Sequence, residues 1–143
     1  MSMTFEDLDA WEKARELVNS VYAMTRDGSL AKDFGLCGQV QRVAVSVMSD
    51  VAEGFERTHL AEKLQAYNVA RASCGEVRSL LYVIEDNYPG KVSIVRATRA
   101  IAGQAGSLVT GLTASTRRRL PGKVAAFVVG IGVIAWVSLQ ALT

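Results

Sequence analysis

The chain has 143 residues, of which 50% are hydrophobic, and its 16 Lys/Arg and 14 Asp/Glu give a net charge of +2. This length is enough for one domain with one core. One histidine, His59, and two cysteines outside any CxxC pattern exclude a typical zinc site. GxGxxG, GxxxxGK[ST], HExxH and GxSxG are all absent, so we expect no enzyme, no metal and no cofactor.

Four amphipathic helices are predicted, and together they indicate an all-α fold, an antiparallel up-down four-helix bundle. The first covers about residues 5–25, with Thr4 as its N-cap, Asp7 as the capping-box partner and Trp11 as its main apolar anchor. The second covers about 34–57. The third covers about 60–86, and the fourth covers about 91–114. The third carries an apolar heptad seam of Tyr67, Ala70, Cys74, Val77, Leu81, Ile84 and Tyr88. The fourth helix is expected to bury Ile94, Ala97, Ile101, Ala105, Leu108 and Leu112.

Cys37 and Cys74 are expected to be buried, free thiols. Residues 1–20 carry acids throughout and lack an apolar signal region, which predicts a cytoplasmic, reduced protein.

Charge is distributed unevenly along the chain. Residues 1–90 hold 9 Lys/Arg and 14 Asp/Glu, whereas residues 91–143 hold 7 Lys/Arg and no acid. An acid-free basic segment points to a polyanionic neighbour such as nucleic acid, anionic lipid or the protein's own acidic half. The candidate nucleic-acid contacts on the fourth helix are Lys91, Arg96 and Arg99.

A polar stripe follows one side of the second helix. Its steps of 3, 4, 4, 3 and 4 residues have the period of an α-helix. The stripe consists of Gln39, Arg42, Ser46, Asp50, Glu53 and Arg57. Both charge signs alternate along it, and Gly54 beside it would let another backbone approach closely. We therefore expect a partly buried seam that fixes helix register or a subunit contact.

The last 20 residues contain no charge, and at 1.5 Å per residue they would span about 30 Å. We expect residues 1–116 to form the bundle, 117–123 a basic linker, and 124–143 an additional hydrophobic helix. That helix either crosses the inner membrane, with the bundle on the cytoplasmic face, or is buried within an oligomer. The basic residues that would flank the membrane are Arg117, Arg118, Arg119 and Lys123.

Residues 5 to about 88 carry three motifs that occur together in one protein family. The first comprises Phe5, Leu8, Trp11, Ala14, Leu17, Val21, Tyr22 and Thr25, and the second comprises Phe34, Gly35, Leu36, Gln39, Arg42, Ala44 and Ser46. The third is an Asn-Ile-Ala-Glu-Gly…Arg signature, present here as Asp50, Val51, Ala52, Glu53, Gly54 and Arg57. Tyr67, Ala70, Ser73 and Glu76 extend the match into the third helix. The chain thus resembles the four-helix-bundle proteins encoded by intervening sequences in bacterial 23S rRNA genes.

The resemblance implies a small non-enzymatic bundle that assembles into a homo-oligomeric ring, often a pentamer. It also implies a distant likeness to the accessory protein of diversity-generating retroelements, a basic pentameric barrel that binds nucleic acid and a reverse transcriptase. Two features depart from the family: Asp50 replaces its Asn, and residues 121–143 extend beyond its usual end. Two hypotheses follow. One is an oligomeric scaffold that binds RNA, DNA or a ribonucleoprotein partner through the basic fourth helix. The other is a membrane-tethered interaction module with an unknown protein partner.

Overall fold

The computed structural model describes residues 1–119, which fold into helices without a strand, and the all-α prediction is confirmed for this part of the chain. The long helices are α1 (Asp9–Met24), α2 (Phe34–Glu56), α3 (Leu60–Asn87) and α4 (Val92–Arg118). Short 3-10 helices are η1 (Phe5–Asp7), η2 (Leu30–Lys32) and η3 (Pro89–Lys91). The predicted hydrophobic helix at 124–143 and Lys123 lie outside the described residues.

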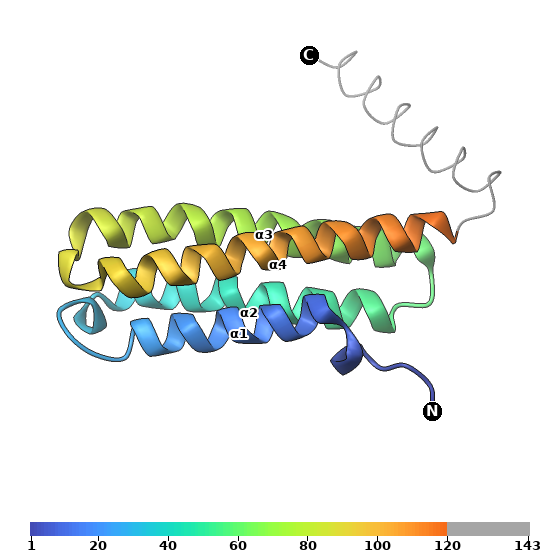
Figure 1. Cartoon of the computed structure of the whole chain (residues 1–143), viewed down its shortest axis with the longest axis horizontal. Helices are drawn as coiled ribbons and strands as arrows, with labels where there is room; N and C mark the ends of the chain where they lie inside the picture. Colours follow the sequence, from blue (N-terminus) through green and yellow to red (C-terminus); the bar gives the residue numbers. More distant parts are fainter. Residues whose placement is uncertain (120–143) are drawn as a thin grey trace, which may run out of the picture.

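The four long helices lie side by side along the long axis of the molecule (Figure 1). α1 packs against α2 and α4, and α3 packs against the same two helices. The α1–α2 connection and the turn between α3 and α4 lie at one end of the bundle, and the α2–α3 connection lies at the other (Figure 1). Each helix therefore has two neighbours and buries one stripe of side chains between them.

The predicted seam of α3 forms the core, and only its last residue departs from the prediction. Its buried members are Tyr67, Ala70, Cys74, Val77, Leu81 and Ile84, whereas Tyr88 is half-buried. On α2 the buried set is Cys37, Val40, Ala44, Val47, Val51 and Gly54. Valine has a mediocre helix propensity. Burial, at about 1.5–3 kcal/mol for each fully buried valine, is what stabilises α2.

The start of the first helix differs from the prediction. Thr4 and Asp7 do form a capping box, with the Thr4 backbone N–H donating to the Asp7 carboxylate at 2.8 Å. This box caps the N-terminus of η1 and not that of α1. Leu8 then adopts an extended conformation (φ −79°, ψ 126°), and α1 begins at Asp9. This break puts Leu8 into an apolar cluster, where Trp11 is only half-buried. The prediction of one helix from residue 5 was therefore wrong in its first turn.

The buried face of α4 also differs from the prediction. It comprises Val95, Thr98, Ala102, Ala105 and Val109, whereas Ala97 is exposed. The predicted isoleucines and leucines flank this face and are half-buried. The predicted face is displaced because a polar residue, Thr98, occupies the core. Its hydroxyl lies 2.6 Å from the Ser20 hydroxyl on α1 and 2.7 Å from the Ile94 carbonyl, so burial leaves it satisfied.

Two polar contacts join the α1–α2 connection to the turn between α3 and α4. The Tyr88 hydroxyl donates to the Asp33 carboxylate at 2.7 Å, and Lys91 Nζ donates to Asp27 at 2.5 Å. Gly28 has φ +71°, a conformation that favours glycine, and the Lys91 side chain lies against it. We call this pair of contacts the end clasp. These bonds lower the pKa of both carboxyls, so the clasp stays ionised below their ordinary titration range.

Candidate functional site

The polar stripe of α2 contacts α3 near its middle. The Ser46 hydroxyl lies 2.9 Å from the Ser73 hydroxyl on α3 and donates to Asp50 at 3.3 Å. Burial raises the pKa of the Asp50 carboxyl. Ser46 and Asp50 are half-buried, whereas four members are exposed: Gln39, Arg42, Glu53 and Arg57. The stripe is thus partly buried within the bundle, as expected, but only at its centre.

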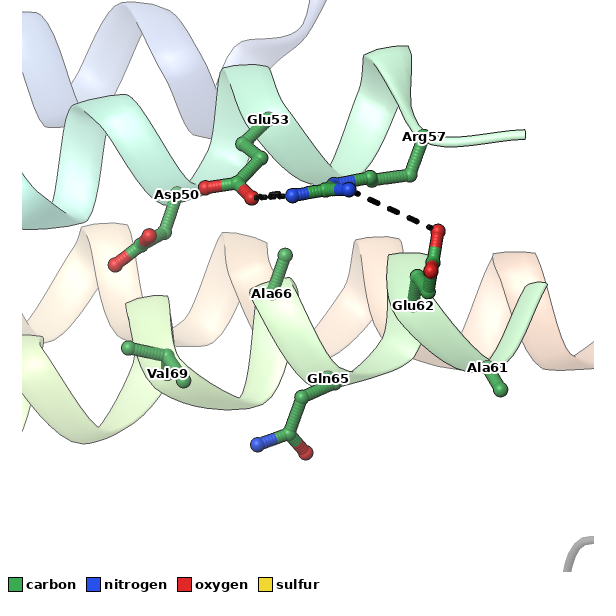
Figure 2. Close-up of a pocket in the computed structure, with 8 residues that line it drawn as sticks. All are labelled: Asp50, Glu53, Arg57, Ala61, Glu62, Gln65, Ala66 and Val69. Carbon is green, nitrogen blue, oxygen red and sulfur yellow. Dashed lines mark hydrogen bonds and ion pairs between the residues drawn. The ribbon is translucent and has the colours of Figure 1, made fainter. Parts of the chain in front are cut away.

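The C-terminal half of the stripe borders a cavity between α2 and α3 (Figure 2). In Figure 2 the Arg57 guanidinium lies between two carboxylates, at 2.5 Å from Glu53 and 3.9 Å from Glu62. All three side chains are about half exposed, so solvent screens both pairs and each contributes little to stability. With Asp50, three carboxylates and one guanidinium line the cavity. The cavity therefore carries negative charge and disfavours an anionic ligand.

Gly54 lies beside this cavity and allows a close contact between α2 and α3. A Cβ at this position would lie 2.5 Å from Tyr67 Cε1 and 2.7 Å from Cδ1. The expected close approach to Gly54 exists. The group that approaches is a buried tyrosine ring, whereas the prediction was that another backbone would approach. Because α3 can approach α2 only with glycine here, this contact fixes the relative position of the two helices.

The three candidate nucleic-acid residues each pair with an acid. Lys91 bonds to Asp27 in the end clasp. Arg96 Nε and Arg99 Nη1 both contact Glu85 on α3, at 2.9 and 2.6 Å. The close guanidinium of Arg99 and then that of Arg96 hold the pKa of the Glu85 carboxyl below its usual range. The positive charge expected from these residues is therefore partly neutralised within the bundle.

A groove between α3 and α4 contains two further arginines, Arg71 and Arg78. Within residues 1–119, neither guanidinium has a carboxylate within 4.0 Å. We call this surface the α3–α4 groove. From α3 it is lined by Arg71, Cys74, Gly75, Arg78 and Tyr82. From α4 it is lined by Arg96, Arg99, Ala100, Ala102, Gly103, Gln104, Gly106, Ser107, Leu108 and Thr110.

Sequence reasoning missed Arg71 and Arg78 because they belong to the net-acidic half of the chain. The signal that could have found them is their spacing. Seven residues place them two turns apart on one side of α3, next to the seam that packs on α4. The basic residues 91–119 contain no aromatic residue among them. The structure brings Tyr82 to them, with the Arg99 guanidinium carbon 4.0 Å from its ring centroid.

The basic residues at the end of α4 are exposed. Arg117 and Arg118 form its last turn and Arg119 follows as the C-cap, so α4 extends two residues beyond the predicted end of the bundle. Cations at this position interact favourably with the helix dipole, an alternative to a role in flanking a membrane. None of the helices within residues 1–119 combines the length and hydropathy that a membrane crossing requires.

Metal-binding and nucleophilic chemistry finds little support in the part of the chain that the structure describes. That part contains no group of three or more His, Cys, Asp or Glu side chains placed to hold a metal ion. His59 is exposed at the α2–α3 connection. Cys37 and Cys74 are buried, free thiols, as predicted. Burial raises the pKa of Cys74 to about 11, which keeps it protonated and unreactive at neutral pH.

Four packed amphipathic helices with open polar grooves between them define a small helical-bundle protein. The family model described as "23S rRNA-intervening sequence protein" matches residues 6–107, from η1 through most of α4. The chain belongs to this family, as the motifs in its first three helices indicated. A comparison with curated proteins found no match.

Proposed function

We propose that the protein is a non-enzymatic, homo-oligomeric scaffold. Each subunit is an antiparallel four-helix bundle, and nucleic acid or a ribonucleoprotein partner binds across α3 and α4. One observation carries this proposal. The α3–α4 groove is lined by four guanidinium groups, from Arg71, Arg78, Arg96 and Arg99, whereas two acids beside it, Glu85 and Asp86, both act on Arg99.

Arginine suits this role because its planar guanidinium binds phosphate oxygens in pairs and stays charged at any physiological pH. Glu85 offsets the charges of Arg96 and Arg99, so Arg71 and Arg78 contribute most of the excess. In a ring of identical subunits this surface would recur once per subunit. A polyanion that contacts several subunits would gain from that repetition.

The test is binding of the full-length protein to fluorescent RNA and DNA oligonucleotides, followed by anisotropy. With about three phosphate contacts, affinity should fall roughly 10- to 100-fold between about 50 and 200 mM salt. An Arg71→Ala/Arg78→Ala variant should bind more weakly than the wild-type protein, because it removes from the groove two guanidinium groups that are unpaired within residues 1–119. A Lys91→Ala/Arg96→Ala/Arg99→Ala variant should also lose affinity, because it removes three cations and leaves the carboxylate of Glu85 unpaired. No binding at micromolar protein and low salt, or binding that salt leaves unaltered, would overturn the proposal.

A matched control removes two cations outside the groove. Arg26 and Lys32 are exposed, and neither has a carboxylate within 4.0 Å among residues 1–119. Arg26→Ala/Lys32→Ala has the same net charge as Arg71→Ala/Arg78→Ala. An equal loss of affinity in both variants would indicate non-specific attraction to the whole protein and would count against a defined site.

The polar stripe is proposed as a subunit contact. Its exposed members Gln39, Arg42, Glu53 and Arg57 belong to the motifs that identify the family, although they contribute little to the single subunit. The stripe also borders a groove between α1 and α2, where Tyr22 and Val45 are exposed. Exposed apolar side chains beside polar ones are typical of subunit interfaces.

Native mass spectrometry of Glu53→Ala tests the contact. The wild-type protein should form a ring, which the resemblance predicts to be a pentamer. We expect Glu53→Ala to form a smaller assembly. Glu56→Ala is the control, because Glu56 is an exposed acid on the same helix turn outside the stripe. If Glu53→Ala leaves both oligomer size and melting temperature unchanged, the stripe is only the solvated side of a helix.

A membrane-tethered interaction module is the second candidate function, supported by the 20 uncharged residues at 124–143 and the basic residues before them. Lys or Arg near a membrane surface contributes about 1 kcal/mol each through anionic lipid. A reporter fused to the C-terminus should cross the membrane if this segment is an anchor. Release of the full-length protein by carbonate extraction would rule the anchor out. Anchoring and nucleic-acid binding are compatible with each other.

A further inference from the structure

We infer that the α3–α4 groove takes a single-stranded polynucleotide, with Tyr82 stacking on a base while Arg71, Arg78 and Arg96 contact phosphates. This inference rests on the proposed nucleic-acid function and adds the substrate class and the mode of recognition.

The shape of the groove leaves room for a strand between the two helices. Gly75 on α3 and Gly103 on α4 both line it, and a Cβ built at either glycine would meet nothing within 4 Å. Gly106 and Ser107 continue this low surface along α4. The absence of side-chain bulk lets a ligand approach both helix backbones, and the longer side chains of Arg71 and Arg78 stand beside it.

Tyr82 is the aromatic group that a stacking site requires. It is 53% exposed although it lies in the groove, and the Arg99 guanidinium carbon is 4.0 Å from its ring centroid. Glu85 holds Arg99 at 2.6 Å, and the Arg99 side chain is only 18% exposed. Arg99 is therefore a positioning residue. It covers part of the ring, fixes the ring orientation and leaves the rest of the ring open for a base.

Arg96 differs from Arg99 although both pair with Glu85. Its side chain is 69% exposed, so the guanidinium can reach a phosphate without leaving the surface. Arg71 and Arg78 are seven residues apart, about 10 Å along α3, and Tyr82 follows about 6 Å further on. This row of two cations and one aromatic ring is about 16 Å long, which suits a few nucleotides.

The presence of Tyr82 favours a single strand over a duplex. In a duplex the bases are stacked and paired in the interior, so only phosphates would meet the groove and the ring would contribute nothing. In a single strand each base exposes a face, and stacking on an aromatic side chain combines with a positive groove in the usual sequence-tolerant way. RNA and DNA strands share this chemistry, and the experiment separates them.

The experiment measures binding of the full chain to labelled single strands of about 12 nucleotides, as RNA and as DNA, and to the same sequences as duplexes. Tyr82→Leu should weaken single-strand binding roughly 5- to 100-fold, and Tyr82→Phe should bind like the wild-type protein, because the ring and not the hydroxyl makes the stack. Phe34→Leu, at an exposed aromatic residue at the start of α2 that lies outside the groove, is the control and should change little. Gly103→Leu should block the groove, whereas Gly111→Leu should not, since Gly111 does not line it.

The outcomes separate the two proposals. If the wild-type protein binds no nucleic acid, both are overturned. If binding depends on Arg71 and Arg78 but is indifferent to Tyr82→Leu, or if duplexes bind more tightly than single strands, the single-strand inference is overturned and the proposed function stands. Selective loss of single-strand affinity in Tyr82→Leu and Gly103→Leu supports both. Tighter binding of the RNA strand or of the DNA strand then shows which of the two nucleic acids the groove prefers.

Discussion

Replacing Gly54 by alanine tests the packing of α2 against α3 directly. The added Cβ would lie 2.5 Å from Tyr67 Cε1, whereas carbon atoms in optimal contact are about 3.5–4.0 Å apart. Tyr67 is 2% exposed, so the ring cannot swing into solvent. Overpacking of this kind costs about 1–3 kcal/mol, and the better helix propensity of alanine returns about 1 kcal/mol. The difference is a net loss of about 0–2 kcal/mol. Because the buried Tyr67 ring has little room to move aside, we expect the upper half of this range, about 1–2 kcal/mol, or roughly 3–8 °C in melting temperature.

The assay is thermal and urea unfolding of the full-length protein at one fixed concentration, because oligomerisation makes stability depend on concentration. Gly111→Ala is the matched control. It lies on α4 with nothing within 4 Å of the added Cβ, so it should stabilise the protein by about 0.5–1 kcal/mol. In a Tyr67→Leu background, Gly54→Ala should no longer destabilise, since the ring is gone. A Gly54→Ala protein that melts at or above the wild-type temperature would refute the reasoning.

Three further predictions concern buried and paired groups. Thr98→Val should lower the free energy of unfolding by about 1 kcal/mol, because the Ser20 hydroxyl loses its partner at 2.6 Å. The control Thr110→Val should have little effect, and equal urea midpoints for the two variants would contradict the prediction. Because the Glu85 pKa is lowered in the folded state, the contribution of Glu85 to stability is complete above the ordinary glutamate pKa of about 4.3 and is lost as pH falls through the lower folded value. Urea midpoints of the wild-type protein should therefore drop more steeply below about pH 4 than those of Glu85→Gln. Parallel curves for the two proteins would contradict this prediction. Cys74 should react slowly with Ellman's reagent in the native protein at about pH 8 and fully in urea, and rapid native labelling would show that the thiol is not buried.

The fold was predictable where apolar spacing alone determines burial. The seam of α3 alternates steps of three and four, and six of its seven predicted residues are buried. α4 was harder to predict because its apolar residues outnumber the positions that its two neighbours can cover. The core then includes Thr98, whose burial depends on the Ser20 hydroxyl 78 residues away. No local pattern reports such a partner.

The candidate site was less predictable than the fold because charge pairing acts between distant parts of the chain. Lys91 meets Asp27 across 64 residues and Arg96 meets Glu85 across 11, so counting charges along the sequence overestimates the free charge of α4. The same counting hides Arg71 and Arg78, which lie in the net-acidic half but face the acid-free helix. The α3–α4 groove is formed by side chains from two helices. The pattern of residues along one helix predicts which face is buried, but it does not predict which residues of the other helix will lie opposite.

The end clasp has a consequence for the way the bundle can open. At one end of the molecule the α1–α2 pair and the α3–α4 pair are joined covalently, through the connection that contains His59. At the opposite end the bonds from Tyr88 to Asp33 and from Lys91 to Asp27 connect the two pairs, in addition to the core packing of α2 on α3 and of α1 on α4. These bonds lie at the end where no chain connection joins the two pairs. Loss of the end clasp should therefore loosen that end of the bundle before the end that contains the α2–α3 connection.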